Sequence, residues 1–96
     1  MLVRIEDIDW IESASNYIEL HTGKQTHLIR MTMSEIEAKL DLNRFVRIHR
    51  TTIVNIDRVQ ELNIGYHGES DVKLRDGTVL RASRQYRERL ANLLPL

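Results

Sequence analysis

Residues 45–55 form the segment that most constrains the fold of this chain. Val46 and Ile48 alternate with Arg47, as residues do on a half-buried β-strand, and apolar residues resume at Ile53. Between these two β-like segments lie three side chains that can donate hydrogen bonds: His49, Arg50 and Thr51. Binding groups concentrate on loops that a rigid sheet holds in place, so a binding loop is one interpretation. The alternative is a surface turn with an incidental arginine.

The rest of the chain consists largely of short alternating segments separated by turn residues, which predicts a mainly β fold. Besides the two central segments, strands are predicted at residues 2–5, 8–12, 17–21, 26–31, 59–64, 72–75 and 78–82. An Asp-Gly pair gives a strong hairpin signal between the last two. A three-residue loop with a left-handed Gly77 is preferred there, because it pairs Leu74 with Leu80 and keeps apolar residues on one face. The same register pairs Val72 with Ala82.

Two helices are predicted, at about 33–41 and at about 84–94. The first begins with a capping box, in which Thr32 is the N-cap and Glu35 the N3 residue. The second is expected to have Ser83 as its N-cap and to pack an apolar stripe on the sheet. That stripe consists of Tyr86, Leu90, Leu93 and Leu94.

The composition excludes several classes of site. The chain has no cysteine, so disulfides and thiolate metal sites are excluded. No apolar run approaches the roughly 18 residues of a membrane span, and no signal-peptide pattern is present, so a cytoplasmic location is expected. Residues 1–43 hold four basic against eight acidic side chains, and residues 44–96 hold ten against six. This asymmetry is a weak indication of an anionic partner for the second half.

Catalysis is not predicted. The four histidines lack metal-ligand spacing, and no glycine-rich phosphate loop is present. No serine has the sequence context of an activated nucleophile. No metal site and no cofactor are therefore expected.

Two further groups of polar side chains are candidates for binding an anion or a nucleic acid. Arg81, Arg84 and Arg87 surround the predicted start of the second helix, where the helix dipole disfavours cations but would favour a bound phosphate. The alternative is a solvated basic face. Asn16 lies at a predicted break between strands, where an asparagine either reads adenine or makes a turn. Together with Arg50, these residues predict that one sheet edge presents three groups to a common partner.

These pieces resemble the LytTR DNA-binding domain of bacterial response regulators over nearly the whole chain. The most specific match is Phe-x-Arg-x-His-Arg-Thr at residues 45–51, followed by Ile-Val-Asn at residues 53–55. Further matches are Ile-Glu-Ser-Ala-Ser-Asn-Tyr-Ile at residues 11–18 and Ala-Ser-Arg-Gln-Tyr at residues 82–86. Thr51 stands where serine is common in the family, which keeps the hydroxyl.

The resemblance implies an elongated antiparallel β fold of about ten short strands in small sheets. It implies that loops, rather than a helix, enter successive major grooves of a bent duplex and read its sequence in transcription control. The DNA-binding residues that it implies are Asn16, Tyr17, His49, Arg50, Thr51, Arg84, Gln85 and Arg87.

In this family the domain usually follows a phosphoacceptor receiver domain, and pairing places two copies on promoter direct repeats. The chain is therefore expected to be an excised effector domain, monomeric by itself, whose parent is a dimer on DNA. A protein-interaction module that uses exposed β edges is the alternative function.

Overall fold

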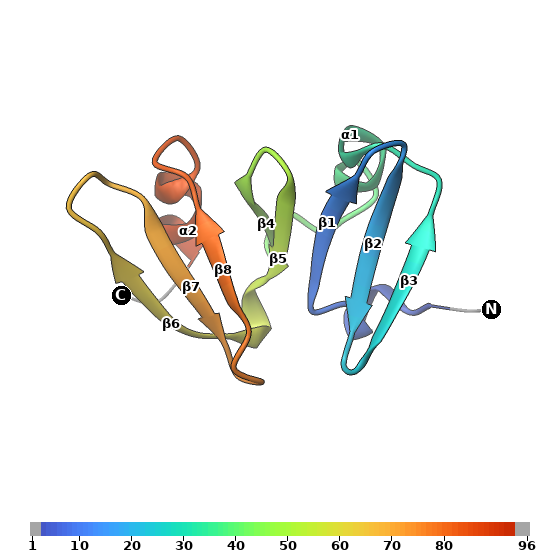
Figure 1. The fold of residues 1–96 in the computed structure, drawn as a ribbon, viewed down its shortest axis with the longest axis horizontal. Helices are drawn as coiled ribbons and strands as arrows, with labels where there is room; N and C mark the ends of the chain where they lie inside the picture. The colour runs from blue at the N-terminus through green and yellow to red at the C-terminus, as the bar shows by residue number, and fades with distance from the viewer. Residues whose placement is uncertain (1–2, 94–96) are drawn as a thin grey trace.

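The chain folds into two antiparallel sheets that stand side by side along an elongated molecule (Figure 1). The computed structural model describes residues 3–93, and its principal extents are 40 × 23 × 21 Å. Eight strands and two short α-helices lie in this part of the chain. The predicted mainly β, elongated fold is therefore confirmed, with eight strands where about ten were expected.

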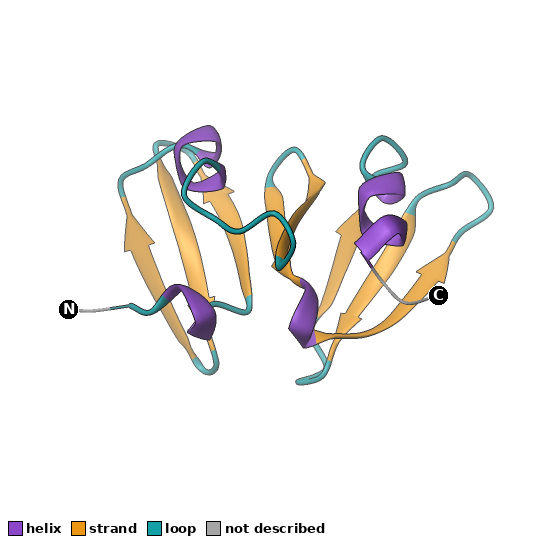
Figure 2. Cartoon of the chain, turned by 180° about the vertical axis from the view of Figure 1, so that it is seen from behind, coloured by secondary structure: helices purple, strands orange, loops and turns teal. Residues whose placement is uncertain are grey.

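The larger sheet has five strands in the order β3-β2-β1-β5-β4. Its strands are β1 (Trp10–Ala14), β2 (Tyr17–Thr22), β3 (Gln25–Ile29), β4 (Phe45–His49) and β5 (Thr52–Asn55). Helix α1 (Met33–Glu37) lies on one face of this sheet, as Figure 2 shows from behind. Ile36 from the helix packs there in one core with Ile11, Ile18 and Ile53.

The smaller sheet has three strands in the order β6-β7-β8 and is covered by the second helix. Its elements are β6 (Val59–Ile64), β7 (Ser70–Leu74), β8 (Val79–Ala82) and α2 (Arg87–Leu93). Leu90 of α2 is fully buried in a second core with Val72 and Leu80. Ile48 of β4 belongs to the same core, so the central hairpin contributes to both halves of the molecule.

Polar contacts fix the junction between the two sheets. Asn55 is buried, and its side chain donates to the carbonyl oxygen of Ile8 at 2.9 Å and accepts from the Asp57 N–H at 3.0 Å. The second of these bonds caps a short 3-10 helix, η2 (Ile56–Arg58), that leads into β6. Arg58 then pairs with Asp9 at 2.7 Å, which ties the start of the smaller sheet to the approach to β1.

The predicted first strand at residues 2–5 is wrong in the part that the structure describes. A 3-10 helix, η1 (Ile5–Asp7), occurs there instead, and residues 1–2 lie outside the described residues. The N–H of Asp7 bonds to Arg4 O and that of Ile8 to Ile5 O. The turn forms its backbone hydrogen bonds locally, whereas a strand needs a neighbouring strand to supply them. Ile8, which follows the turn, is buried in the core.

Both predicted helices are shorter than expected. The capping box of α1 is confirmed, because Thr32 Oγ1 accepts from the Glu35 N–H and Glu35 accepts from the Thr32 N–H, each at 3.1 Å. The helix ends at Glu37 rather than near 41.

The last helix begins at Arg87 rather than near 84, and Ser83 is not its N-cap. The Ser83 N–H donates to Ile48 O at 2.8 Å, which continues the strand direction, and its hydroxyl has no hydrogen-bond partner. A turn follows, in which the Tyr86 N–H donates to Ser83 O at 3.0 Å. Of the predicted apolar stripe, Leu94 lies outside the described residues.

The hairpin between β7 and β8 has the predicted three-residue loop but not the predicted pairs. Gly77 is left-handed, with φ of 96°. The Leu74 N–H donates to Thr78 O at 2.8 Å, and Val72 lies opposite Leu80. The predicted pairs were therefore two residues out of register. A shift of two residues leaves every side chain on the same face of the sheet, which is why the predicted apolar face is still the buried one.

Candidate nucleic-acid interface

Three connections between elements lie at one end of the molecule, which is the upper edge in Figure 1. They are the β1–β2 turn, the β4–β5 turn and the turn between β8 and α2. Backbone hydrogen bonds join them, because the Ser13 N–H donates to Thr51 O at 2.9 Å and the Ser83 N–H donates to Ile48 O at 2.8 Å. The β4–β5 hairpin is thus held on both sides, and the three turns form one rigid row.

The first turn presents Asn16 and Tyr17 to solvent. Ala14 pairs with Tyr17 across the hairpin, so Ser15 and Asn16 form a two-residue loop. Ser15 has a φ of 62° and is the one non-glycine residue with positive φ within residues 3–93. A positive φ at the first loop position is typical of primed turns, whose twist matches that of the flanking strands. Both predicted site residues of this turn are exposed.

The second turn holds His49 and Thr51 in a defined arrangement. The Thr51 N–H donates to His49 Nδ1 at 3.2 Å, and Thr51 Oγ1 lies 2.9 Å from the same nitrogen. A nitrogen that accepts from a backbone N–H carries a lone pair, so the neutral imidazole has its proton on Nε2. His49 Nε2 is then left as a donor for a partner outside the chain, while the Thr51 hydroxyl serves the turn itself.

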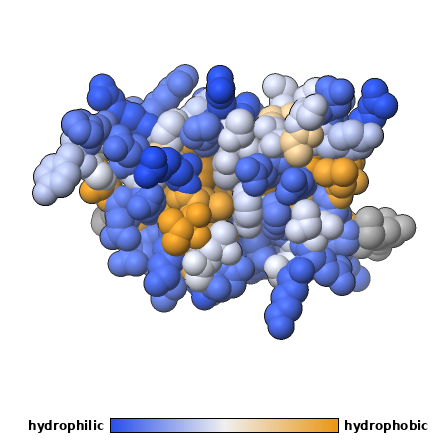
Figure 3. Space-filling view, viewed as in Figure 1, coloured by the Kyte–Doolittle hydropathy of each residue, from blue (hydrophilic) through white to orange (hydrophobic). Residues whose placement is uncertain are grey.

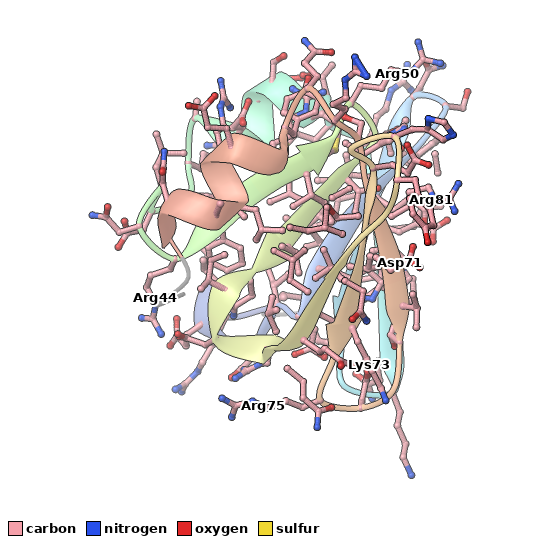
Figure 4. The ribbon with its side chains drawn as sticks, turned by 90° about the vertical axis from the view of Figure 1, so that its left-hand side faces the viewer. Arg44, Arg50, Asp71, Lys73, Arg75 and Arg81 are labelled. Atoms are coloured by element: carbon pink, nitrogen blue, oxygen red, sulfur yellow. The ribbon has the colours of Figure 1, made fainter. Side chains whose placement is uncertain are left out.

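Arg50 is the exposed residue at the tip of the second turn. Its side chain makes no hydrogen bond or ion pair within the described part of the chain. Figure 4 places it at the upper end of the molecule, far from Arg44 and Arg75 at the lower end. Arg44 there is ion-paired with Asp57 at 2.8 Å, a contact that raises the pKa of this guanidinium.

Arg47 is a residue of the site that the sequence did not reveal. Its Nε donates to His49 O at 3.4 Å, its Nη2 donates to Arg50 O, and its Nη1 meets Glu37 of α1 at 3.4 Å. The guanidinium also lies 6.0 Å from the ring centroid of Tyr86 in the third turn. With a side chain only 18% exposed, Arg47 connects α1, the second turn and the third turn. The motif contained this arginine, but its alternation on the strand suggested a solvent-facing position.

The third turn presents Arg84 and Gln85, both exposed. Arg84 Nη1 donates to His67 O of the β6–β7 loop at 3.4 Å. The side chain of Arg87 lies outside the described part of the structure. The prediction that Arg81 belongs to a cluster of arginines around the start of the second helix is wrong. Arg81 lies on β8, and its Nε is 3.9 Å from Asp71 Oδ1 on the side seen in Figure 4.

The surface of this end is predominantly hydrophilic in the face that Figure 3 shows, whereas apolar side chains reach the surface lower down over the sheets. Exposed apolar residues in the strands include Leu28 on β3 and Val79 on β8. On the face that Figure 3 shows, the loop-bearing end therefore combines exposed hydrogen-bond donors with a mostly hydrophilic surface, which suits a polar, anionic partner.

One group of potential metal ligands occurs among the described residues, on the strands below the first turn. Glu12, Glu19 and His21 offer atoms within 4.8 Å of one another on one face of β1 and β2. His21 Nε2 lies 3.4 Å from Glu19, and its ring stacks on Trp10 with a centroid distance of 3.8 Å. Burial lowers the pKa of His21, and the neighbouring carboxylates oppose this in part.

Among residues 3–93, no helix has the length and apolar character needed to cross a membrane.

The chain matches known proteins over nearly its full length. Residues 1–95 match the family described as the LytTr DNA-binding domain. The sensory transduction protein LytT of Bacillus anthracis is 29% identical over 98% of this chain, and the transcriptional regulatory protein BtsR of Escherichia coli is 27% identical over 99%. The match covers 38% and 39% of those two proteins, so the chain spans well under half of their length.

A solved structure has the same fold. A structure titled "LytTr DNA-binding domain of putative methyl-accepting/DNA response regulator from Bacillus cereus" superposes with a TM-score of 0.90 and 20% sequence identity, covering 100% of this chain and 88% of that one. The fold matches that of this solved domain, and the sequence matches the family model over residues 1–95. The chain belongs to the LytTr DNA-binding domain family.

Proposed function

We propose that this chain is the sequence-specific DNA-binding effector domain of a bacterial response regulator, acting in the cytoplasm. The observation that carries the proposal is the row of three turns, in which exposed donors from separate parts of the chain share one edge. Loops on a rigid scaffold hold binding groups well, and phosphates and base edges both accept hydrogen bonds from such donors.

The side chains divide into two roles. Arg50 is the proposed base-reading residue, because its guanidinium has no hydrogen-bond or ion-pair partner within residues 3–93 and is available for bidentate binding of guanine. His49, through Nε2, is proposed to bind a phosphate and so to fix the register of the protein on the duplex. Thr51 acts mainly by holding His49, since its backbone N–H and hydroxyl are already used within the turn.

The outer turns extend the interface on either side of Arg50. Asn16 and Tyr17 are proposed to contact DNA on one side, and Arg84 with Gln85 on the other, with Arg87 as a further phosphate partner. The row of turns runs along the long axis of the molecule (Figure 1), so its outer turns are proposed to contact different stretches of the duplex.

The proposed parent protein carries a receiver domain and binds as a dimer to promoter direct repeats. This chain spans under two fifths of its relatives, which leaves room for such a domain in them. By itself the chain is proposed to be a monomer that binds weakly, because one domain forms half of the contacts.

The test is selection of bound duplexes from a random DNA pool at stated salt, followed by dissociation constants at several salt concentrations. Enrichment of one motif, with affinity that falls linearly in logarithm with salt, supports the proposal. A folded protein that enriches no motif and retards no duplex at low salt contradicts it.

A protein-interaction module is the second candidate, favoured by the free edge of β3. In the described part of the chain that strand pairs only with β2, and Leu28 on it is 59% exposed. A partner strand could add to this edge through main-chain hydrogen bonds. In that case Arg50→Ala and Arg84→Ala would leave partner binding intact, whereas the DNA proposal requires both changes to weaken DNA binding.

A further inference from the structure

A fourth connection, the β6–β7 loop at residues 65–69, lies beside the third turn at the same end of the molecule (Figure 1). Two of its side chains, Tyr66 and His67, are exposed, and Tyr66 is fully so. The loop is closed by its own backbone, because the Gly65 N–H donates to Glu69 O at 2.7 Å and the Gly68 N–H donates to Gly65 O at 3.3 Å. The loop therefore has a defined backbone conformation, and it lies beside the turn that holds Arg84.

The side chain of Arg84 packs against this loop. A Cβ atom placed on Gly68 would lie 2.5 Å from Cδ and 2.8 Å from Cγ of Arg84, so no larger residue fits without displacing the arginine. Gly68 also has a φ of 90°, which L side chains rarely adopt. At the end of the same side chain, Nη1 donates to His67 O at 3.4 Å. Gly68 and the His67 carbonyl thus support both the stem and the head of Arg84.

Tyr66 adds a donor to the same edge. A tyrosine hydroxyl is among the side-chain groups that donate to phosphate oxygens in protein–DNA complexes. Tyr66 is fully exposed, and the neighbouring Arg84 has no carboxylate partner among the residues that the structure describes. This pair of side chains suits contact with the sugar-phosphate backbone.

We propose that the β6–β7 loop is a fourth element of the DNA interface, in which Gly68 and the His67 carbonyl position Arg84 and Tyr66 contacts the phosphate backbone. This inference rests on the proposed DNA-binding function. Gly68 is a positioning residue, because it acts through Arg84 rather than by touching DNA.

The experiment compares Gly68→Ala with Gly77→Ala on a duplex selected from the random pool. Gly77 is a matched control, since its φ of 96° imposes the same backbone cost, nothing lies within 4 Å of its Cβ position, and its hairpin is at the opposite end of the molecule. Gly68→Ala is expected to weaken binding about 5- to 150-fold, the range for loss of one arginine contact to DNA, and the same loss is expected of Arg84→Ala. Gly77→Ala is expected to leave the dissociation constant unchanged.

Two further variants complete the test. The double variant Gly68→Ala, Arg84→Ala is expected to bind no more weakly than Arg84→Ala alone, because both changes remove the same contact. Tyr66→Ala is expected to weaken binding several-fold and to reduce the salt dependence by about one phosphate contact. If Gly68→Ala melts below Gly77→Ala, then Gly68→Asn and Gly77→Asn replace the pair, because asparagine tolerates positive φ while still meeting Arg84.

The inference is overturned if Gly68→Ala binds like the unsubstituted chain, or if its effect adds fully to that of Arg84→Ala. An unchanged dissociation constant and salt slope for Tyr66→Ala removes the phosphate contact. These results differ from failure of the proposed function itself, in which the unsubstituted chain enriches no motif and Arg50→Ala changes nothing.

Discussion

The Arg47 guanidinium donates to the backbone carbonyl oxygen of Arg50, so that one arginine fixes the turn from which another extends into solvent. Arg47 is mostly buried and also binds Glu37, whereas the Arg50 side chain has no partner among the described residues. The two residues are three positions apart and have opposite roles. Mutation should separate those roles into an effect on stability and an effect on binding.

Arg50→Ala should weaken binding to the selected duplex by about 1–3 kcal/mol and relax specificity at one base position. The melting temperature should stay the same, because no internal contact is lost. The control is Arg75→Ala, which removes an exposed arginine from the lower end of the molecule (Figure 4). Equal losses of affinity for the two variants would mean that the net charge of the chain, and not the position of Arg50, determines the affinity for DNA.

Arg47→Met should reduce both stability and DNA binding. Methionine keeps the apolar stem but removes the donor to the carbonyl oxygens of the second turn and leaves Glu37, among the described residues, with only Arg89, 4.0 Å away. The expected cost is about 1–3 kcal/mol in the free energy of unfolding. Urea denaturation measures this loss, and titration with the selected duplex measures binding. A variant that unfolds at the same urea concentration as the unsubstituted chain would contradict the assignment of Arg47 as the anchor of the turn.

Thr32→Ala should lower the free energy of unfolding by about 1 kcal/mol, because it removes the N-cap of α1. The dissociation constant for DNA should not change at a temperature where the variant is folded, since α1 contributes no proposed contact. Chemical denaturation and the duplex titration together check this. A large loss of affinity without loss of stability would place α1 in the interface.

The stability of the domain should fall as the pH drops below about 6.5, in part because of His21. Burial lowers the pKa of this ring in the folded chain, against opposing effects of Glu19 and Glu12. Between the lowered pKa and the ordinary value of 6.5, the unfolded chain binds more protons, so acidification favours unfolding. His21→Phe keeps an aromatic ring on Trp10 and should lose less stability between pH 7.5 and 5.5. A larger loss in His21→Phe than in the unsubstituted chain would mean that protonation of His21 stabilises the folded chain, contrary to this prediction.

The features that the sequence predicted correctly are those specified by neighbouring residues. Thr32 and Glu35 are three positions apart, so their capping box is a local pattern. The break at residues 49–51 between two apolar segments is likewise local, and the structure has a hairpin turn there. Such patterns depend little on the rest of the fold.

The features that the sequence missed depend on contacts from distant parts of the chain. Arg47 looked like a solvent-facing strand residue because Glu37 and Tyr86, which surround it, come from other elements. Ser83 looked like an N-cap, but its N–H is taken by Ile48, which extends the strand direction and delays the start of the helix. The contact of Arg84 with Gly68 joins residues sixteen positions apart, and nothing near either residue in the sequence indicated it.

The most direct test of the three-turn interface is a titration of the isotope-labelled domain with the selected duplex, in which amide NMR signals report the binding. Signals of residues 15–17, 49–52 and 83–86 should shift together at one dissociation constant. Signals of the β2–β3 turn and the β7–β8 turn, at the opposite end, should stay in place. Shifts confined to the opposite end, or to only one of the three turns, would contradict a common DNA-binding edge.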